Sequence, residues 1–161
     1  MKEIKNYLHL YLGCKCKGKS GSMVYTLIDV GIDRSSLLLD KYGNECVIFD
    51  FKPILRPLSD IKVDELKLLA SWSGICSPED WECVPNEPYK VKHKECENTF
   101  EISSIGNDLV SRKSKGWKDL DHTSQQMTIF KQLLDWHFDI FSLIKAGLAI
   151  DATTLNEGTT V

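Results

Sequence analysis

The sequence predicts an α+β fold, in which an antiparallel β-sheet of about six to seven short strands packs against a long C-terminal helix and a shorter central helix. Two observations predict it. Residues 123–151 have the apolar spacing of one face of an α-helix, and the region before them contains short β-rich runs separated by turns. Because these runs precede the helix instead of alternating with helices, their order favours antiparallel pairing over a parallel α/β sheet. Residues 1–151 are expected to form a single domain, and the small polar residues 152–161 a flexible tail.

The N-terminal third is expected to form a three- or four-stranded meander. The expected strands are residues 7–12, 23–30, 36–39 and 46–51. Gly43 and Asn44 lie between the last two and suit the positive φ angles of a tight turn, which predicts a hairpin. Residues 13–22 contain three glycines and three lysines and are expected to form a loop.

Prolines and a helical pattern characterise the next stretch. Pro53 and Pro57 each lack an amide hydrogen and have a fixed φ, so residues 52–58 are expected to be an extended connector or an edge strand, not a central strand. The shorter helix is expected over residues 61–73, ending at Gly74.

The middle of the chain is expected to combine a loop with short strands. Residues 75–88 contain three prolines and are expected to be a loop with one helical turn at residues 77–81. The expected strands that follow are residues 89–93, 100–105 and 108–112, the last two joined by a turn at Gly106 and Asn107.

The C-terminal helix is expected to run from about residue 124 to residue 146, roughly 33 Å at 1.5 Å per residue. Apolar residues recur there at steps of three and four: Met127, Phe130, Leu134, Phe138, Phe141, Ile144 and Leu148. Thr123 and Gln126 fit a capping box, and Gly147 suits a left-handed end. Charged residues interrupt the run too often for a membrane span, which needs roughly 20 apolar residues. Residues 148–151 are expected to be a short final strand or a tucked coil.

Charge and composition exclude several classes of function. The formal net charge of −3 argues against general nucleic-acid binding, because such proteins are usually basic. The N-terminal residues lack the apolar core of a signal peptide, so the protein is expected to be cytoplasmic. In that compartment the six cysteines are expected to be free thiols.

Cysteine and histidine side chains allow one metal hypothesis. Cys76, Cys83, His93 and Cys96 together have the ligand types of a tetrahedral zinc site. Only the last pair has a spacing typical of zinc ligands, so free thiols are the favoured interpretation and no metal or other cofactor is expected. Zinc binding by these four residues is left open.

Catalytic groups are sparse in the sequence. Glu79, Asp80 and Glu82 surround Trp81, but three adjacent acids in a proline-rich loop are typical of a solvated surface. No serine or cysteine nucleophile has a convincing histidine partner. The sequence therefore favours a protein without catalytic residues.

A literal phosphate-loop match occurs near the N-terminus. Gly13, Gly18, Lys19 and Ser20 satisfy the spacing G-x-x-x-x-G-K-S. A true phosphate loop opens a helix, whereas the residues that follow here are β-like. We therefore interpret this stretch as a lysine-rich hairpin turn.

Basic residues are clustered in three segments, one of which includes Trp117. Lysines can balance the charge of a phosphate group, an indole can stack on a base, and Gly116 would let backbone amides approach closely. The expected ligand-binding residues are Lys15, Lys17, Lys19, Lys92, Arg112, Lys113, Lys115, Trp117 and Lys118.

Three segments resemble small uncharacterised proteins encoded by phages and prophages of anaerobic gut bacteria. They are YLHLYLGC at residues 7–14, KPILRPLSD at 52–60 and WHFDIFSLIKAGLAID at 136–151. The resemblance supplies no catalytic residues. It implies a short accessory protein that binds something in the host cell.

Three functions follow as hypotheses. The first is a phage-encoded, non-catalytic binding protein that sequesters a phosphate-bearing small molecule, such as a nucleotide immune signal, as a counter-defence. The alternative is a protein-interaction module, as a homo-oligomer or alone, that inhibits a host protein or takes part in phage assembly. An enzyme is the third and has the fewest candidate residues.

Overall fold

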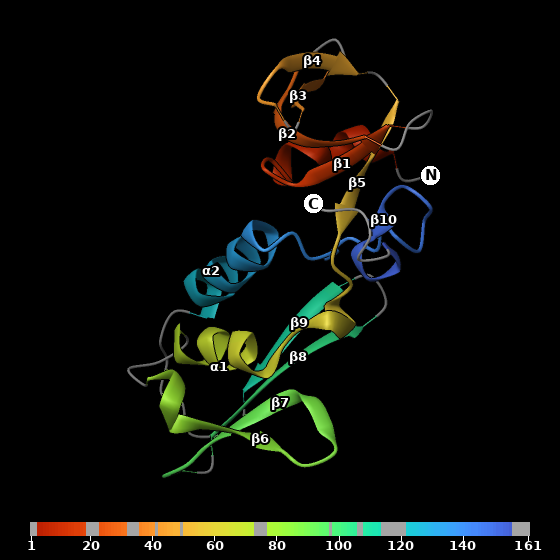
Figure 1. Ribbon diagram of the computed structural model, residues 1–161. Helices are drawn as coiled ribbons and strands as arrows, with labels where there is room; N and C mark the ends of the chain where they lie inside the picture. The colour runs from red at the N-terminus through yellow and green to blue at the C-terminus, as the bar shows by residue number, and fades with distance from the viewer. Residues whose placement is uncertain are drawn as a thin grey trace. The chain divides into compact units, whose positions relative to one another are not determined.

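Two sheets with mostly antiparallel strands and two α-helices make up the α+β fold (Figure 1). The computed structural model describes residues 3–18, 23–31, 36–40, 42–48, 50–72, 77–96, 98–105, 108–113 and 122–155. Contacts divide the chain into two compact units, the first formed by residues 1–58 and 133–161 and the second by residues 59–132. The single domain and the flexible tail expected from the sequence stay predictions.

The first unit contains a six-stranded sheet with the order β10-β5-β1-β2-β3-β4. Its strands are β1 (Lys15–Gly18), β2 (Val24–Val30), β3 (Ser36–Leu39), β4 (Glu45–Ile48), β5 (Phe51–Leu55) and β10 (Ile150–Asp151). Neighbouring strands are antiparallel, except for the parallel pair β10 and β5. The expected strands over residues 23–30 and 36–39 are confirmed, and so is the hairpin at Gly43. The Asp40 carboxylate holds that turn by accepting the N–H groups of Tyr42 and Asn44 at 2.8 and 2.9 Å.

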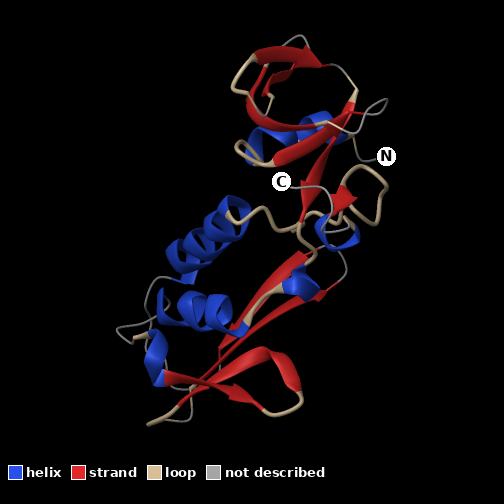
Figure 2. Ribbon diagram, viewed as in Figure 1, coloured by secondary structure: helices blue, strands red, loops and turns tan. Residues whose placement is uncertain are grey.

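The strand expected over residues 7–12 is wrong, because this segment forms the 3-10 helices η1 (Ile4–Asn6) and η2 (Leu8–Leu10) (Figure 2). Leu8 is 5% exposed and Tyr11 is fully buried, whereas Leu12 is 48% exposed. Burial three residues apart fits a helical turn; in a strand, Leu12 would share the face of Leu8. The loop expected over residues 13–22 is also wrong in part, because β1 lies within it.

A proline lies inside the sheet, contrary to the edge position expected for residues 52–58. β5 is flanked by β1 and β10, with Pro53 opposite Cys16 of β1. β10 pairs only with Ile54 and Leu55. The ladder on that side therefore begins just after Pro53, and the missing proline amide costs no hydrogen bond to β10.

The prediction that the C-terminal helix continues to about residue 146 is wrong, because the helix ends at Asp135. α2 spans His122–Asp135, and His137 then adopts a left-handed φ of 59°. The chain turns to pair with Arg56, whose N–H donates to the His137 carbonyl at 2.9 Å. The Arg56 carbonyl in turn accepts the N–H of Asp139 at 2.7 Å. Tertiary pairing with the end of β5 thus replaces the helical hydrogen bonds that the apolar spacing predicts.

An aspartate organises the turns that follow. The Asp139 carboxylate accepts the N–H groups of Leu143 and Ile144 at 2.7 and 2.8 Å. Ser142 and Gly147 have φ angles of 55° and 71°, which keep this segment from continuing as an α-helix. The apolar residues of the stretch still reach the core, since Leu143 is fully buried.

We expect His137 to make the stability of the protein depend on pH. Burial disfavours the charged imidazole and lowers the pKa of His137, partly offset by the hydrogen bond to the Leu12 carbonyl and by Asp135. The unfolded chain therefore binds a proton near pH 6.5 that the folded chain takes up only at lower pH, so the free energy of unfolding falls as pH drops below about 6.5.

His137→Asn should flatten that dependence in urea denaturation measured from about pH 7 to about pH 5.5, because asparagine does not titrate and tolerates a left-handed φ. His9 is exposed. His9→Asn is therefore the matched control and should leave the slope unchanged. Equal slopes in His137→Asn and the unsubstituted protein would contradict the prediction.

The second unit contains a four-stranded antiparallel meander with the order β6-β7-β8-β9. Its strands are β6 (Trp81–Val84), β7 (Glu87–His93), β8 (Thr99–Ile105) and β9 (Asp108–Lys113). The strands expected over residues 89–93, 100–105 and 108–112 are confirmed. The helical turn is also confirmed as η4 (Pro78–Asp80), with a capping box between Ser77 and Asp80. β6 lies within residues 75–88, which were expected to be a loop, so that expectation is wrong in part.

The expected central helix is confirmed as α1 (Val63–Trp72), which contacts β6 and β7 (Figure 1). Its buried residues Leu66, Leu69 and Ala70 lie on the apolar face. In the same unit the sheet buries Trp81, Val91 and Phe100.

The described residues contain ten strands in two sheets, so the expectation of six to seven strands in a single sheet is wrong. Within the described ranges, no helix has the length and apolar content to cross a membrane.

Candidate functional site on the six-stranded sheet

The nine expected ligand-binding residues are distributed over both units. Lys15 and Lys17 lie on β1 of the first unit, and Lys92 lies on β7 of the second. Arg112 and Lys113 lie on β9, also in the second unit. The remaining four, Lys19, Lys115, Trp117 and Lys118, lie outside the described residues. Neither unit therefore contains the complete set.

Two lysines of the second unit are paired with carboxylates. The Lys92 ammonium lies 3.0 Å from a Glu82 carboxylate oxygen across the β6–β7 pair. Lys90 donates to Glu87 at 2.9 Å, and this hydrogen bond raises the pKa of Lys90. Because each charge is balanced locally, these lysines offer little net attraction to an anion.

Lysines of the first unit form a different arrangement on the outer side of the sheet. Along β1 the pleat places Cys16 in the core with no exposed surface, and Lys15 and Lys17 on the opposite face. Lys17 lies directly opposite Lys52 of β5, so their side chains share that face. We call Lys15, Lys17 and Lys52 the outer basic face.

Sequence reasoning missed Lys52. The residue stood in a stretch interpreted as a proline-rich connector, which gives no indication of a strand partner. The available sequence signal was that Lys52 stands between Phe51 and Pro53, a charged residue alternating with apolar ones. In the structure only the lysine of these three is exposed.

The outer basic face has no compensating charge in the described part of the chain. No ion pair joins Lys15, Lys17 or Lys52 to a described carboxylate. Like charges directly opposite each other on a sheet are destabilising by about 0.2–1 kcal/mol. An anion bound between Lys17 and Lys52 would remove that repulsion, so the face is suited to a phosphate or a carboxylate.

The literal phosphate-loop match does not form a phosphate cradle within its described residues. Gly13 has a φ of 87° and donates its N–H to the Leu27 carbonyl at 2.7 Å. The following residues form β1, which pairs with β2 on one side and β5 on the other. Strand ladders therefore occupy residues 15–18, and β1 and β2 pair antiparallel as a hairpin requires. The predicted turn itself, with Lys19 and Ser20, lies outside the described residues.

Comparisons with protein-family models, curated proteins and solved structures find no match. The assignment of function therefore depends on the chemistry of individual residues.

Two thiols lie close together beneath the outer basic face. The sulfur atoms of Cys14 and Cys16 are 3.8 Å apart, and both residues are fully buried. Their hydrogen bond and their burial raise the pKa of Cys16. A protonated, buried thiol is a poor nucleophile and a poor metal ligand, which favours a packing role for this pair.

The four residues of the zinc hypothesis are only partly described. Cys83 and Cys96 are exposed free thiols, and Cys76 lies outside the described residues. Among the residues that are described, no group of three or more histidine, cysteine or acidic side chains could hold a metal ion.

The acidic residues around Trp81 have structural roles. The Asp80 carboxylate accepts the N–H of Ser77 at 2.8 Å to complete the capping box. The Ser77 hydroxyl donates to Glu79, and this hydrogen bond lowers the pKa of the Glu79 carboxyl. Glu82 pairs with Lys92. The lowered pKa of Glu79 is opposite to the raised carboxyl pKa that general acid catalysis needs.

Proposed function

We propose that the protein is a non-catalytic binding protein that sequesters a phosphate-bearing small molecule at its outer basic face. The observation that carries this proposal is the uncompensated pairing of Lys17 with Lys52 across β1 and β5. A sheet that keeps two like charges opposite each other loses stability when empty and regains it when an anion binds.

The geometry favours a ligand with more than one phosphate group. Residues directly opposite on antiparallel strands have Cβ atoms about 4.5–5.5 Å apart. Lys15 and Lys17 lie two residues apart on one strand, a rise of about 6.6 Å. Flexible lysine stems can converge over such distances, and three ammonium groups would balance a diphosphate, a triphosphate or a dinucleotide.

The resemblance to phage proteins suggests a biological setting for this binding. Sequestration of a nucleotide immune signal in the host cytoplasm would act as counter-defence without any chemical step.

Removing one charge of the Lys17–Lys52 pair should stabilise the ligand-free protein and weaken the binding of phosphate-bearing ligands. For Lys52→Gln we expect the free energy of unfolding at low salt to rise by about 0.2–1 kcal/mol, because the repulsion from Lys17 is lost. Binding of inorganic pyrophosphate and nucleotides should weaken at least about tenfold, equivalent to one charge-assisted hydrogen bond. Urea denaturation and calorimetric titration would measure the two effects.

Lys5→Gln is the matched control, because Lys5 lies in the same unit but is already paired with Glu3 at 2.5 Å. Lys5→Gln removes the same charge, but it should neither raise the free energy of unfolding nor weaken the binding of pyrophosphate and nucleotides. If no member of a broad nucleotide panel binds the unsubstituted protein, sequestration is the wrong function. If binding survives Lys52→Gln but is lost in Trp117→Ala, the ligand binds elsewhere on the chain.

A second candidate, a protein-interaction module, is favoured by β4. This strand lies at the edge of its sheet, and Val47 on it is 54% exposed. Tyr42, in the preceding turn, is 74% exposed. Edge strands with apolar side chains can pair with another chain, which would serve a host protein target or a homo-oligomer. Val47→Lys should abolish such an association in size-exclusion chromatography while leaving ligand binding intact.

A further inference from the structure

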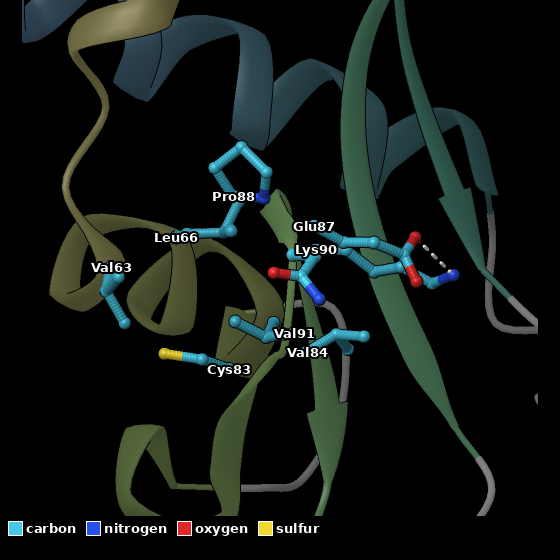
Figure 3. A pocket seen from close by; sticks show the side chains of 9 residues that line it. Val63, Leu66, Cys83, Val84, Glu87, Pro88, Lys90 and Val91 are labelled. Atoms are coloured by element: carbon cyan, nitrogen blue, oxygen red, sulfur yellow. Dashed lines mark hydrogen bonds and ion pairs between the residues drawn. The ribbon is translucent and has the colours of Figure 1, made fainter.

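A small apolar pocket lies in the second unit, beside α1 and the hairpin of β6 and β7 (Figure 3). Its volume is about 150 Å³. The apolar lining consists of Val63, Leu66, Cys83, Val84, Pro88 and Val91. It belongs to the other unit from the outer basic face, so what it binds is independent of the function proposed above.

Burial separates the floor of the pocket from its rim. Leu66 of α1 and Val91 of β7 are each 1% exposed and form the floor. Val63, Cys83 and Pro88 are exposed and form part of the rim. The hollow is therefore an opening onto the core of the unit and not a shallow dent in a polar surface.

The hairpin that forms one wall is conformationally restricted. The ladder of β6 and β7 shifts register between Cys83 and Val84, and Val84 pairs with Glu87. Between them Asn86 has a left-handed φ of 64°, and Pro88 follows with its fixed φ. A bulge and two restricted residues displace the hairpin from regular pairing where the pocket opens, which keeps the walls preformed.

The charges at the pocket cancel each other. Glu87 and Lys90 line it and form an ion pair at 2.9 Å, drawn as a dashed line in Figure 3. A charged ligand would gain nothing from this balanced pair and would have to compete with it. The pocket therefore favours a neutral group, in contrast to the outer basic face.

We propose that this pocket binds a neutral small molecule through an aromatic ring system. A cavity of about 150 Å³ lined mostly by apolar side chains, with Asn86 also in the lining, accommodates a ring of benzene size. An aromatic ring is favoured over an alkyl group because the Cys83 sulfur lines the pocket, and sulfur atoms interact well with π-systems.

Cys83 provides a direct readout of occupancy. Its thiol lines the pocket, whereas Cys96 is an exposed free thiol that does not. With indole as the probe, alkylation of each cysteine by iodoacetamide would be followed by peptide mass spectrometry on the full chain. Indole should slow alkylation of Cys83 at least about threefold near saturation, since a bound ring covers the sulfur, and leave Cys96 unchanged. Benzoate at the same concentration should protect Cys83 less than indole.

A variant that fills the pocket provides a second test of the proposal. Val63→Phe introduces a ring at the rim from a residue that is already 39% exposed, and should itself slow Cys83 alkylation and remove the effect of indole. Val47→Phe, at the exposed position on β4, is the matched control and should keep the indole effect. Unchanged Cys83 alkylation with indole, or equal slowing at Cys83 and Cys96, would overturn the proposal without any variant. Protection by benzoate equal to that by indole would overturn the preference for a neutral ring.

Discussion

Phe138→Ala is expected to lower the free energy of unfolding by about 3–5 kcal/mol, the loss typical of truncating a fully buried phenylalanine. The side chain has no exposed surface, and the Arg56 guanidinium carbon lies 4.3 Å from its ring centre. The backbone of Phe138 forms a parallel bridge with Arg56, and its carbonyl accepts the buried Tyr11 hydroxyl at 3.1 Å. The cavity would therefore open where η2, β5 and the segment after α2 meet.

Urea denaturation of Phe138→Ala and of Phe138→Leu would measure this effect. The leucine variant retains much of the volume and should lose less stability. Tyr42→Ala removes an aromatic ring that is 74% exposed and should change stability by less than about 0.5 kcal/mol. A loss below about 1 kcal/mol in Phe138→Ala would show that the packing around this ring contributes little.

Trp81→Ala should have a similar effect in the second unit, again about 3–5 kcal/mol. Trp81 is the largest fully buried side chain among the described residues, and its ring meets the His93 ring edge-on at 5.5 Å between centroids. Trp72 is 39% exposed, so Trp72→Ala is the matched control and should cost less. Equal losses in the two tryptophan variants would contradict the central role assigned to Trp81.

The same two core variants test the expectation of a single domain. Phe138 belongs to the first unit and Trp81 to the second. If residues 1–151 unfold as one cooperative domain, each substitution should shift a single calorimetric transition. Two transitions, each responding to one substitution only, would mean that the units unfold separately and that the single-domain prediction is wrong.

Local patterns predicted the elements whose hydrogen bonds are made between neighbours in sequence. The β3–β4 hairpin follows from Gly43 and Asn44, and α1 from its apolar face, because turn chemistry and helical periodicity act over a few residues. The prediction of a long C-terminal helix was wrong because the hydrogen bonds of that segment are made with a residue distant in sequence. Its apolar spacing continues past Asp135, but a distant residue, Arg56, takes up the backbone groups of His137 and Asp139. Periodicity contains no information about such a partner.

Site prediction from the sequence reached the same limit. Lys15 and Lys17 could be selected because they cluster with Lys19 in one short glycine-containing stretch, which local pattern reveals. Lys52 could not, because its role depends on the register that places it opposite Lys17.

The sequence by itself determined the α+β class, most strand positions in the two meanders, the central helix and the lysine-rich character of the first hairpin. Only the tertiary structure decided where α2 ends, that the proline-containing β5 lies inside a sheet, and which lysines share a face without a counter-charge. The physical reason is that helical turns and tight hairpins are encoded by neighbouring residues. Strand order, register and charge compensation depend on contacts between residues far apart in the chain.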